Sequence, residues 1–267
     1  AGDAASHAFR TRPNRRINPA TDDLGTLGGT VSTAFGINVF GQIAGSATTP
    51  GDAALHAFRT GPRRAINAAT DDLGLLPNQT FSEALGLDDF GQVVGWPAFV
   101  YSSGVMYDLN ELIDATSGWK ISIATGINDV GEIAAQGAQP YAEGHALLLR
   151  PIYRAIVKSP ISGDGTSIFS ATRAVLTVKF QLRQHNEATC TLPPATIAVA
   201  KAGDSELAAL DESVYSTPSA NGAEFLIDPT GCQYVYHLNA ARLGTGAYRV
   251  DISIHGIMVG HAVFALR

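Results

Sequence analysis

Charged side chains are scarce in this sequence, because Asp, Glu, Lys and Arg together make up only 16% of its 267 residues. The net charge is −6, and the basic residues form no run longer than the pairs Arg15-Arg16 and Arg63-Arg64. A nucleic-acid-binding protein normally carries a basic stripe on one face, so we expect no nucleic-acid partner. No apolar run reaches the roughly 18 residues that a transmembrane helix needs, so we expect no transmembrane segment.

The sequence also lacks the short motifs that mark common catalytic sites. It has no Gly-x-Ser-x-Gly elbow, which argues against an ordinary α/β-hydrolase, and no His-Glu-x-x-His or Cys-x-x-Cys for zinc. Glycine loops for phosphates or dinucleotides are missing too. Cysteine is limited to Cys190 and Cys232, 42 residues apart. We favour a disulfide between them over two buried thiols, because an exported protein permits one.

Glycine, by contrast, is abundant, and it recurs at matching positions of a pattern that repeats along residues 1–150. A period of about 40–50 residues built from short strands is typical of propellers and stacked β-arrays. Asn or Asp followed by Gly between apolar runs indicates tight hairpins, since these residue types tolerate positive φ. We therefore predict an all-β, propeller-like array of about three four-stranded repeats. The matching segments are 6–11 and 55–60, 17–25 and 66–74, and the triplet 36–45, 86–95 and 126–135.

The pattern changes after Pro151, where a polar, Gly-rich linker at residues 159–167 precedes segments with apolar residues at alternate positions. Period-2 alternation over about 100 residues is typical of a small antiparallel sandwich. We therefore predict two domains, a repeat domain at 1–151 and an immunoglobulin-like β-sandwich at 152–267. The expected sandwich strands are 174–182, 195–199, 233–238, 246–254 and 260–266.

The repeats resemble those of the bacterial extracellular HAF-repeat family, named for a His-Ala-Phe strand that stands here at 7–9 and 56–58. The segment 23–29 and the Ile-Asn-x-x-Gly turns complete the match. Residues 177–180, Thr-Val-Lys-Phe, lie in a part that resembles a secreted β-sandwich module with a Pro-x-Lys-Phe signature, here without its proline. Both resemblances imply export from a bacterium, to the periplasm or the extracellular space. The sequence starts inside the first repeat, and we interpret it as a processed or truncated chain without a signal peptide.

Two positions of the repeat recur as carboxylates or amides, whose oxygens calcium prefers as ligands. Equivalent positions of successive blades converge around the axis of a propeller, so these side chains form a candidate calcium site. A calcium ion there would polarise an ester or lactone carbonyl as a Lewis acid. The alternative, which we favour, is that these residues cap turns. The candidate ligands are Asp23, Asp72 and Asp108 at one position, and Asn38, Asp88 and Asn128 at the other.

Three histidines, His7, His56 and His145, share one strand position of the repeat. Their recurrence favours a structural hydrogen bond from the ring to a neighbouring backbone carbonyl over a catalytic role. The two tryptophans, Trp96 and Trp119, are candidates for a platform that binds a carbohydrate or an acyl chain. Large aromatic residues belong more often to the core, and we favour that interpretation for both.

These observations favour a secreted binding or adhesion protein whose repeats present a surface to a small-molecule or glycan ligand. The alternative is a calcium-dependent hydrolase of the esterase or lactonase type, which rests only on the recurring Asp and Asn residues. A third hypothesis is a structural role in a larger assembly, because an unclosed array leaves open strand edges that pair with other strands. Self-association through these edges is a further expectation.

Overall fold

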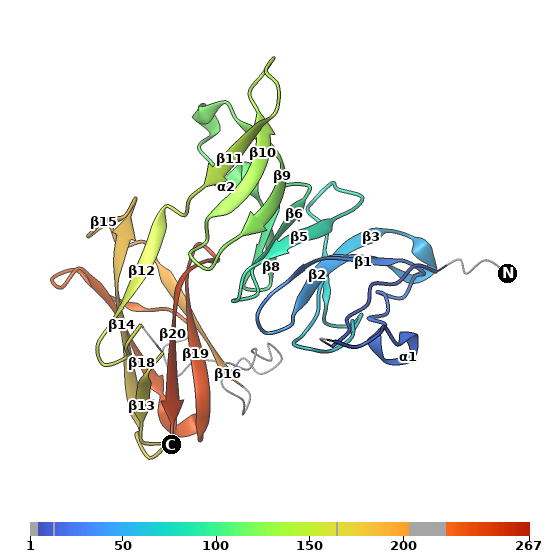
Figure 1. Ribbon diagram of the computed structural model, residues 1–267. Coiled ribbons are helices and arrows are strands. Elements are labelled where there is room, and N and C mark those ends of the chain that lie inside the picture. Colours follow the sequence, from blue (N-terminus) through green and yellow to red (C-terminus); the bar gives the residue numbers. More distant parts are fainter. Residues whose placement is uncertain (1–4, 13, 164, 203–222) are drawn as a thin grey trace. The chain divides into compact units, whose positions relative to one another are not determined.

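The computed structural model describes residues 5–12, 14–163, 165–202 and 223–267 of the chain. Within them the protein is almost entirely β-strand, and its few helices are single turns (Figure 1). The prediction of an all-β protein is confirmed. The chain divides into two compact units, Ala1–Arg150 and Pro151–Arg267. No helix among the described residues is both long and apolar enough to cross a membrane.

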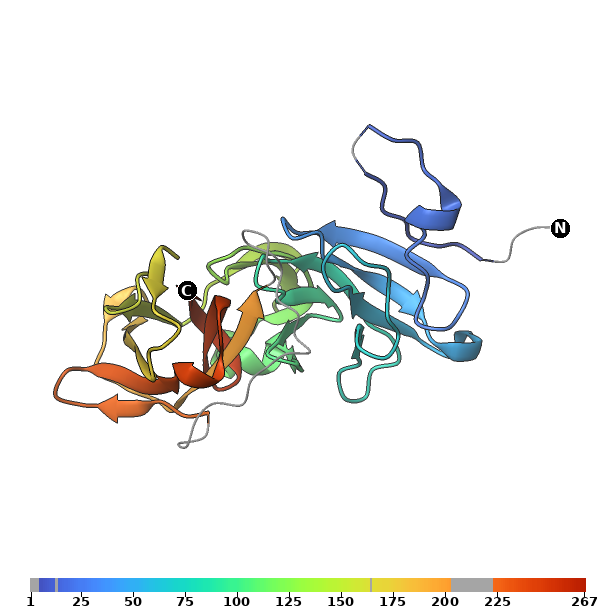
Figure 2. The same cartoon turned by 90° about the horizontal axis from the view of Figure 1, so that it is seen from below.

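The first unit contains three separate antiparallel sheets in its described residues, and the first two have four strands each, in chain order. The third sheet has three strands, and the sheets follow one another along the unit in chain order (Figure 1, Figure 2). Single-turn helices lie in the connections, among them α1 (Pro19–Asp22) and α2 (Leu109–Leu112). The strands are β1 (Ser32–Ile37), β2 (Ile43–Thr48), β3 (Leu55–Arg59), β4 (Asp72–Gly74), β5 (Glu83–Leu87), β6 (Val93–Trp96), β7 (Phe99–Ser102), β8 (Val105–Asp108), β9 (Lys120–Ile127), β10 (Ile133–Ala138) and β11 (His145–Leu149).

A tight turn joins the first two strands of each of these sheets. The last turn residue is Gly41, Gly91 or Gly131, with φ of 73°, 80° and 77° respectively. This left-handed conformation is open to glycine at little steric cost, which explains why glycine recurs there. The strands on either side pair antiparallel in all three sheets. The hairpin prediction is therefore confirmed for every repeat.

The first and second sheets of the first unit each carry a buried phenylalanine on the third strand. Phe58 on β3 is fully buried in a cluster with Ala8, which lies in the segment before the first sheet. Phe99 on β7 is fully buried in a cluster with Ala44 and Ala57 of the first sheet. The first two sheets therefore each build a core together with the part of the repeat unit that precedes them.

The second unit contains two sheets in its described residues, with one shared core. The first has the order β12-β14-β18-β17 with β15 beside β14, and the second has the order β13-β20-β19-β16, with β13 parallel to β20. On β14, Leu176, Val178, Phe180 and Leu182 are buried at every second position, as the alternating pattern predicts. The strands are β12 (Tyr153–Lys158), β13 (Ser167–Phe169), β14 (Val175–Gln184), β15 (Glu187–Ala188), β16 (Ala195–Ala202), β17 (Leu226–Asp228), β18 (Gln233–Asn239), β19 (Gly246–Ile254) and β20 (Ile257–Leu266).

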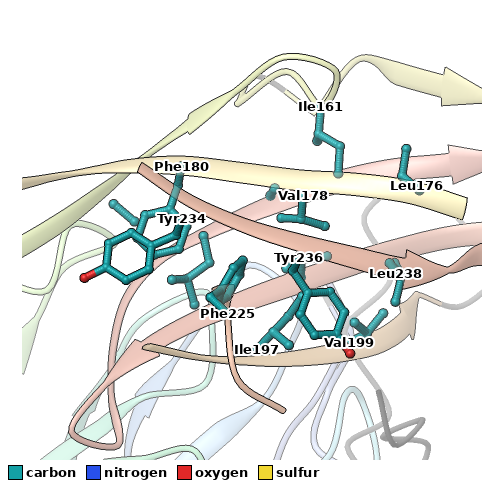
Figure 3. Close-up of a cluster of buried hydrophobic side chains, with 14 of the residues drawn as sticks. Ile161, Leu176, Val178, Phe180, Ile197, Val199, Phe225, Tyr234, Tyr236 and Leu238 are labelled. Carbon is teal, nitrogen blue, oxygen red and sulfur yellow. The ribbon is translucent and has the colours of Figure 1, made fainter. Parts of the chain in front are cut away.

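Aromatic rings form much of this core (Figure 3). Phe180 and Tyr234 stack with their ring centroids 4.3 Å apart, and Phe225 meets Phe180 edge-on with centroids at 4.9 Å. The Tyr234 hydroxyl donates a hydrogen bond of 2.7 Å to the carbonyl of Pro193, so its polar tip is satisfied. Burial of the ring raises the pKa of Tyr234 to about 12.

Cys190 and Cys232 form a disulfide, with their Cα atoms 4.9 Å apart. This confirms the prediction. The bond joins the segment between β15 and β16 to the turn before β18, across a sequence separation of 42 residues. It therefore restrains a long stretch of the unfolded second unit.

We expect the double variant C190S/C232S to lower the free energy of unfolding of the second unit by about 4 kcal/mol, as the loop-entropy relation gives for a loop of this length. Urea unfolding followed by circular dichroism measures the loss. Both tryptophans lie in the first unit, so the tryptophan fluorescence transition is an internal control and should not move. Equal stability of the variant and the parent protein would contradict the expectation.

Candidate functional site

The recurring Asn and Asp residues of the hairpins close their own turns. Oδ1 of Asn38 accepts hydrogen bonds from the backbone N–H groups of Phe40 and Gln42, at 3.1 and 3.0 Å. Asp88 and Asn128 use Oδ1 in the same way, toward the second and fourth residues after them. These oxygens satisfy backbone donors that the turn would otherwise leave without partners. Asn38, Asp88 and Asn128 therefore all cap turns, which is the interpretation that we favoured from the sequence.

The three turns are also bonded to one another across the repeats. Nδ2 of Asn38 donates to the carbonyl of Asp88 at 3.0 Å, and the Val39 N–H donates to Oδ1 of Asp89 at 3.1 Å. The Asp89 N–H donates in turn to Oδ1 of Asp129 at 2.9 Å. The sequence pattern alone did not predict this role of Asp89 and Asp129. In the sequence, Asp89 and Asp129 directly follow the turn-capping residues Asp88 and Asn128. The first repeat has valine at this position, after Asn38.

Two further candidate ligands, Asp23 and Asp72, each hold a histidine. Nδ1 of His7 lies 2.8 Å from Oδ2 of Asp23, and Nδ1 of His56 lies 2.9 Å from Oδ1 of Asp72. The histidines therefore make a recurrent structural bond, but its partner is a carboxylate sixteen residues later and not the backbone carbonyl that we predicted. Each carboxylate also accepts the N–H of the glycine two residues further along, at 2.7 and 2.8 Å.

The second and third sheets depart from this pattern. Asp108 is the N-cap of α2 and accepts the N–H of Asn110 at 2.8 Å. His145 instead meets the ring of Trp119 edge-on, with ring centroids 5.7 Å apart. The six predicted calcium ligands thus fall into a line of turns, two His-Asp pairs and one helix cap. In the part of the chain that the structure describes, no group of three or more His, Cys, Asp and Glu residues is arranged to hold a metal ion.

Hydrogen bonds shift the acid–base equilibria of the carboxylates in this unit. The His7 ring and the Gly25 N–H lower the pKa of Asp23 below its usual value. The Thr48 hydroxyl and then the Thr30 N–H lower the pKa of Asp52 in the same direction. Both groups stay ionised at neutral pH and serve as acceptors, which suits structural roles better than proton transfer.

An exposed aromatic surface lies at the end of the β5–β6 pair. Trp96 is 45% exposed, and the ring of Phe81 meets it edge-on with centroids 4.7 Å apart. The prediction that this tryptophan belongs to the core is therefore wrong. Glu83 stands opposite Trp96 in the strand register, and the Ser46 hydroxyl of the first sheet lies 3.4 Å from its Oε1. An indole ring, a carboxylate and a hydroxyl are thus gathered where two repeats meet.

Comparison with known proteins adds nothing to this picture, since no protein-family model, curated protein or solved structure matches the chain at a significant level.

We expect calcium to leave the stability of the protein unchanged, because each candidate ligand already accepts a hydrogen bond from a backbone or histidine donor. An extracellular calcium site binds with a Kd of about 10⁻⁴–10⁻³ M, so about 10 mM Ca²⁺ would stabilise the fold by 1 kcal/mol or more if such a site existed. Thermal unfolding with Ca²⁺ or with EDTA measures this. A rise in Tm with calcium that is lost in D72N or D88N would restore the predicted site.

Acid should destabilise the first unit. A carboxylate whose pKa is lowered by folding stabilises the folded state above its unfolded pKa of about 3.9. That contribution is lost as the pH falls through the lower folded pKa. The tryptophan-monitored urea midpoint should thus be steady between about pH 7 and 5 and fall below about pH 4. D52N should show a shallower fall. A urea midpoint that rises as the pH is lowered would contradict this expectation.

Proposed function

We propose that this protein is an exported bacterial binding or adhesion module, and that its repeat unit presents a surface to an extracellular glycan. The observation that carries the proposal is the exposed Trp96, which packs edge-on against the half-buried Phe81 and has Glu83 beside it. The flat face of an indole packs on the apolar face of a sugar ring, while a carboxylate accepts hydrogen bonds from sugar hydroxyls. Tryptophan also contributes disproportionately to binding energy where it is part of an interface.

The arrangement of the recurring polar residues supports binding over catalysis. In the described residues the Asp, Asn and His side chains of the repeats bond to turns and to each other, and so build the scaffold. A hydrolase would need a nucleophile or an activated water beside an acid or base. A rigid scaffold that presents an exposed aromatic contact is what a binding module needs.

The finer features of the fold belong to the same proposal. We interpret the stacked sheets of the first unit as propeller-like blades of the HAF-repeat type, and the two sheets of the second unit as an immunoglobulin-like sandwich with the secreted-module resemblance. The disulfide between Cys190 and Cys232 supports export, because such bonds persist in oxidising compartments. The extracellular space or the periplasm is therefore the proposed location.

We expect W96A to weaken glycan binding at least tenfold, equivalent to about 1.4 kcal/mol, because the main apolar contact is lost. Native affinity electrophoresis through gels that contain soluble β-glucan, xylan, mannan or chitosan measures the retardation. V105A is the matched control, since Val105 is a similarly exposed apolar residue of the same sheet. It should bind like the parent protein.

Two outcomes would overturn the glycan proposal: no retardation by any polysaccharide, or equal retardation of W96A and the parent protein. The alternative function is tested in parallel with chromogenic esters and lactones. Hydrolysis that EDTA abolishes and calcium restores would favour the calcium-dependent esterase or lactonase.

A further inference from the structure

The contact that joins successive repeats has two sides. One side is a phenylalanine of the third strand, Phe58 or Phe99, and both are fully buried. The other side is an alanine of the preceding repeat, because Phe58 shares a cluster with Ala8 and Phe99 shares one with Ala57. The motif His-Ala-Phe therefore supplies both sides at once. The alanine of the motif packs against the phenylalanine of the next repeat, and the phenylalanine of the motif packs against the previous repeat.

The last sheet of the first unit has a corresponding face that no described residue of the first unit covers. Ala134 and Ala146 are exposed, and Leu148 is 54% exposed. The corresponding residues of the two earlier sheets are all buried. In the order of the three positions they are Ala44, Ala57 and Arg59 in the first sheet and Val94, Ala98 and Val100 in the second.

A glycine on the first strand of each sheet gives independent evidence that the first two sheets are covered by a following repeat and the third is not. A Cβ placed on Gly36 would lie 2.8 Å from Cδ2 of Leu87 in the next repeat, and one on Gly86 would lie 2.8 Å from the Cα of Gly126. A Cβ on Gly126 would have no atom within 4 Å. The first two glycines are thus packed under a following repeat, and the third lies on an open face.

The opposite end of the array carries the complementary side. Phe9 occupies the position of Phe58 in the His-Ala-Phe motif, which corresponds to Phe99 in Pro97-Ala98-Phe99, but it is 52% exposed. Ala8 beside it is buried, because it already accepts Phe58. One end of the first unit therefore exposes the packing phenylalanine, and the other end exposes the alanines that would accept it.

We propose that these two ends bind one another between copies of the chain, so that the protein associates head to tail. Phe9 of one protomer packs on Ala134 and Ala146 of the next, beside Leu148, in the arrangement that Phe99 makes with Ala44 and Ala57 within the chain. The occupant follows from continuity with this internal interface, since the exposed face has the residue types that bury Phe99. A heterologous contact of this kind either closes into a ring or extends as a filament. The proposal is independent of the glycan site.

The experiment is a complementation between two blocked variants of the full chain. F9S removes the packing side chain and leaves the accepting face intact, whereas A146R blocks that face and leaves Phe9 intact. The parent protein should increase in mass between about 1 and about 200 μM, whereas each variant alone should be monomeric, with at least a tenfold higher Kd. An equimolar mixture should give a species of two chains and no larger one, because each chain keeps one functional end.

Sedimentation velocity and light scattering measure these masses. V105S is the matched control, since it removes an equally exposed apolar residue away from both ends, and it should associate like the parent protein. The altered side chains are exposed, so circular dichroism and Tm should be unchanged. If either variant unfolds, F9K and L148K replace them in the same design.

Three results would overturn the proposal. The parent protein stays monomeric over the whole concentration range. Alternatively, A146R is monomeric while F9S still forms dimers, as a symmetric contact between two open faces would give. Finally, the two variants fail to form a heterodimer when mixed, although each is folded.

Discussion

Burial of a phenylalanine from each of the first two sheets beside alanines of the preceding repeat is the contact on which the first unit depends. Phe58 and Phe99 are fully buried in this way, and full burial of such a side chain contributes about 1.5–3 kcal/mol. The strands are short, and a single repeat cannot bury its apolar face without a neighbouring repeat. Alanine at the accepting positions lets the sheets approach closely, so a single large ring can fill the space between them.

Polar contacts between the turns of successive repeats fix how the stacked sheets are aligned with one another. Asp89 and Asp129 each accept a backbone N–H from the turn of the preceding repeat, and a hydrogen bond to a charged acceptor is stronger than one between neutral groups. The His56–Asp72 pair joins β3 to β4, and the His7–Asp23 pair joins the two matching segments before the first sheet. A recurring carboxylate in a repeat protein can thus reflect assembly of the scaffold.

The second unit achieves stability by other means. Its core is a set of stacked and edge-on aromatic rings between two sheets, and its disulfide restrains the unfolded chain. Neither feature depends on repetition. The two units should therefore differ in which substitutions they tolerate. Stability of the first unit depends on the fit between neighbouring repeats, and stability of the second depends on the packing of one core.

Local patterns in the sequence were sufficient for the all-β class, the hairpins that end in Gly41, Gly91 and Gly131, the alternating burial on β14 and the Cys190–Cys232 pair. Each follows from a local property: strand periodicity, the tolerance of glycine for positive φ, or the chemistry of two thiols. Only the tertiary structure decided that the partner of His7 is Asp23, that Trp96 is exposed and that Asp89 joins two repeats. These outcomes involve side chains 16 to 50 residues apart, and packing of whole sheets, which no local pattern encodes, determines which of them meet.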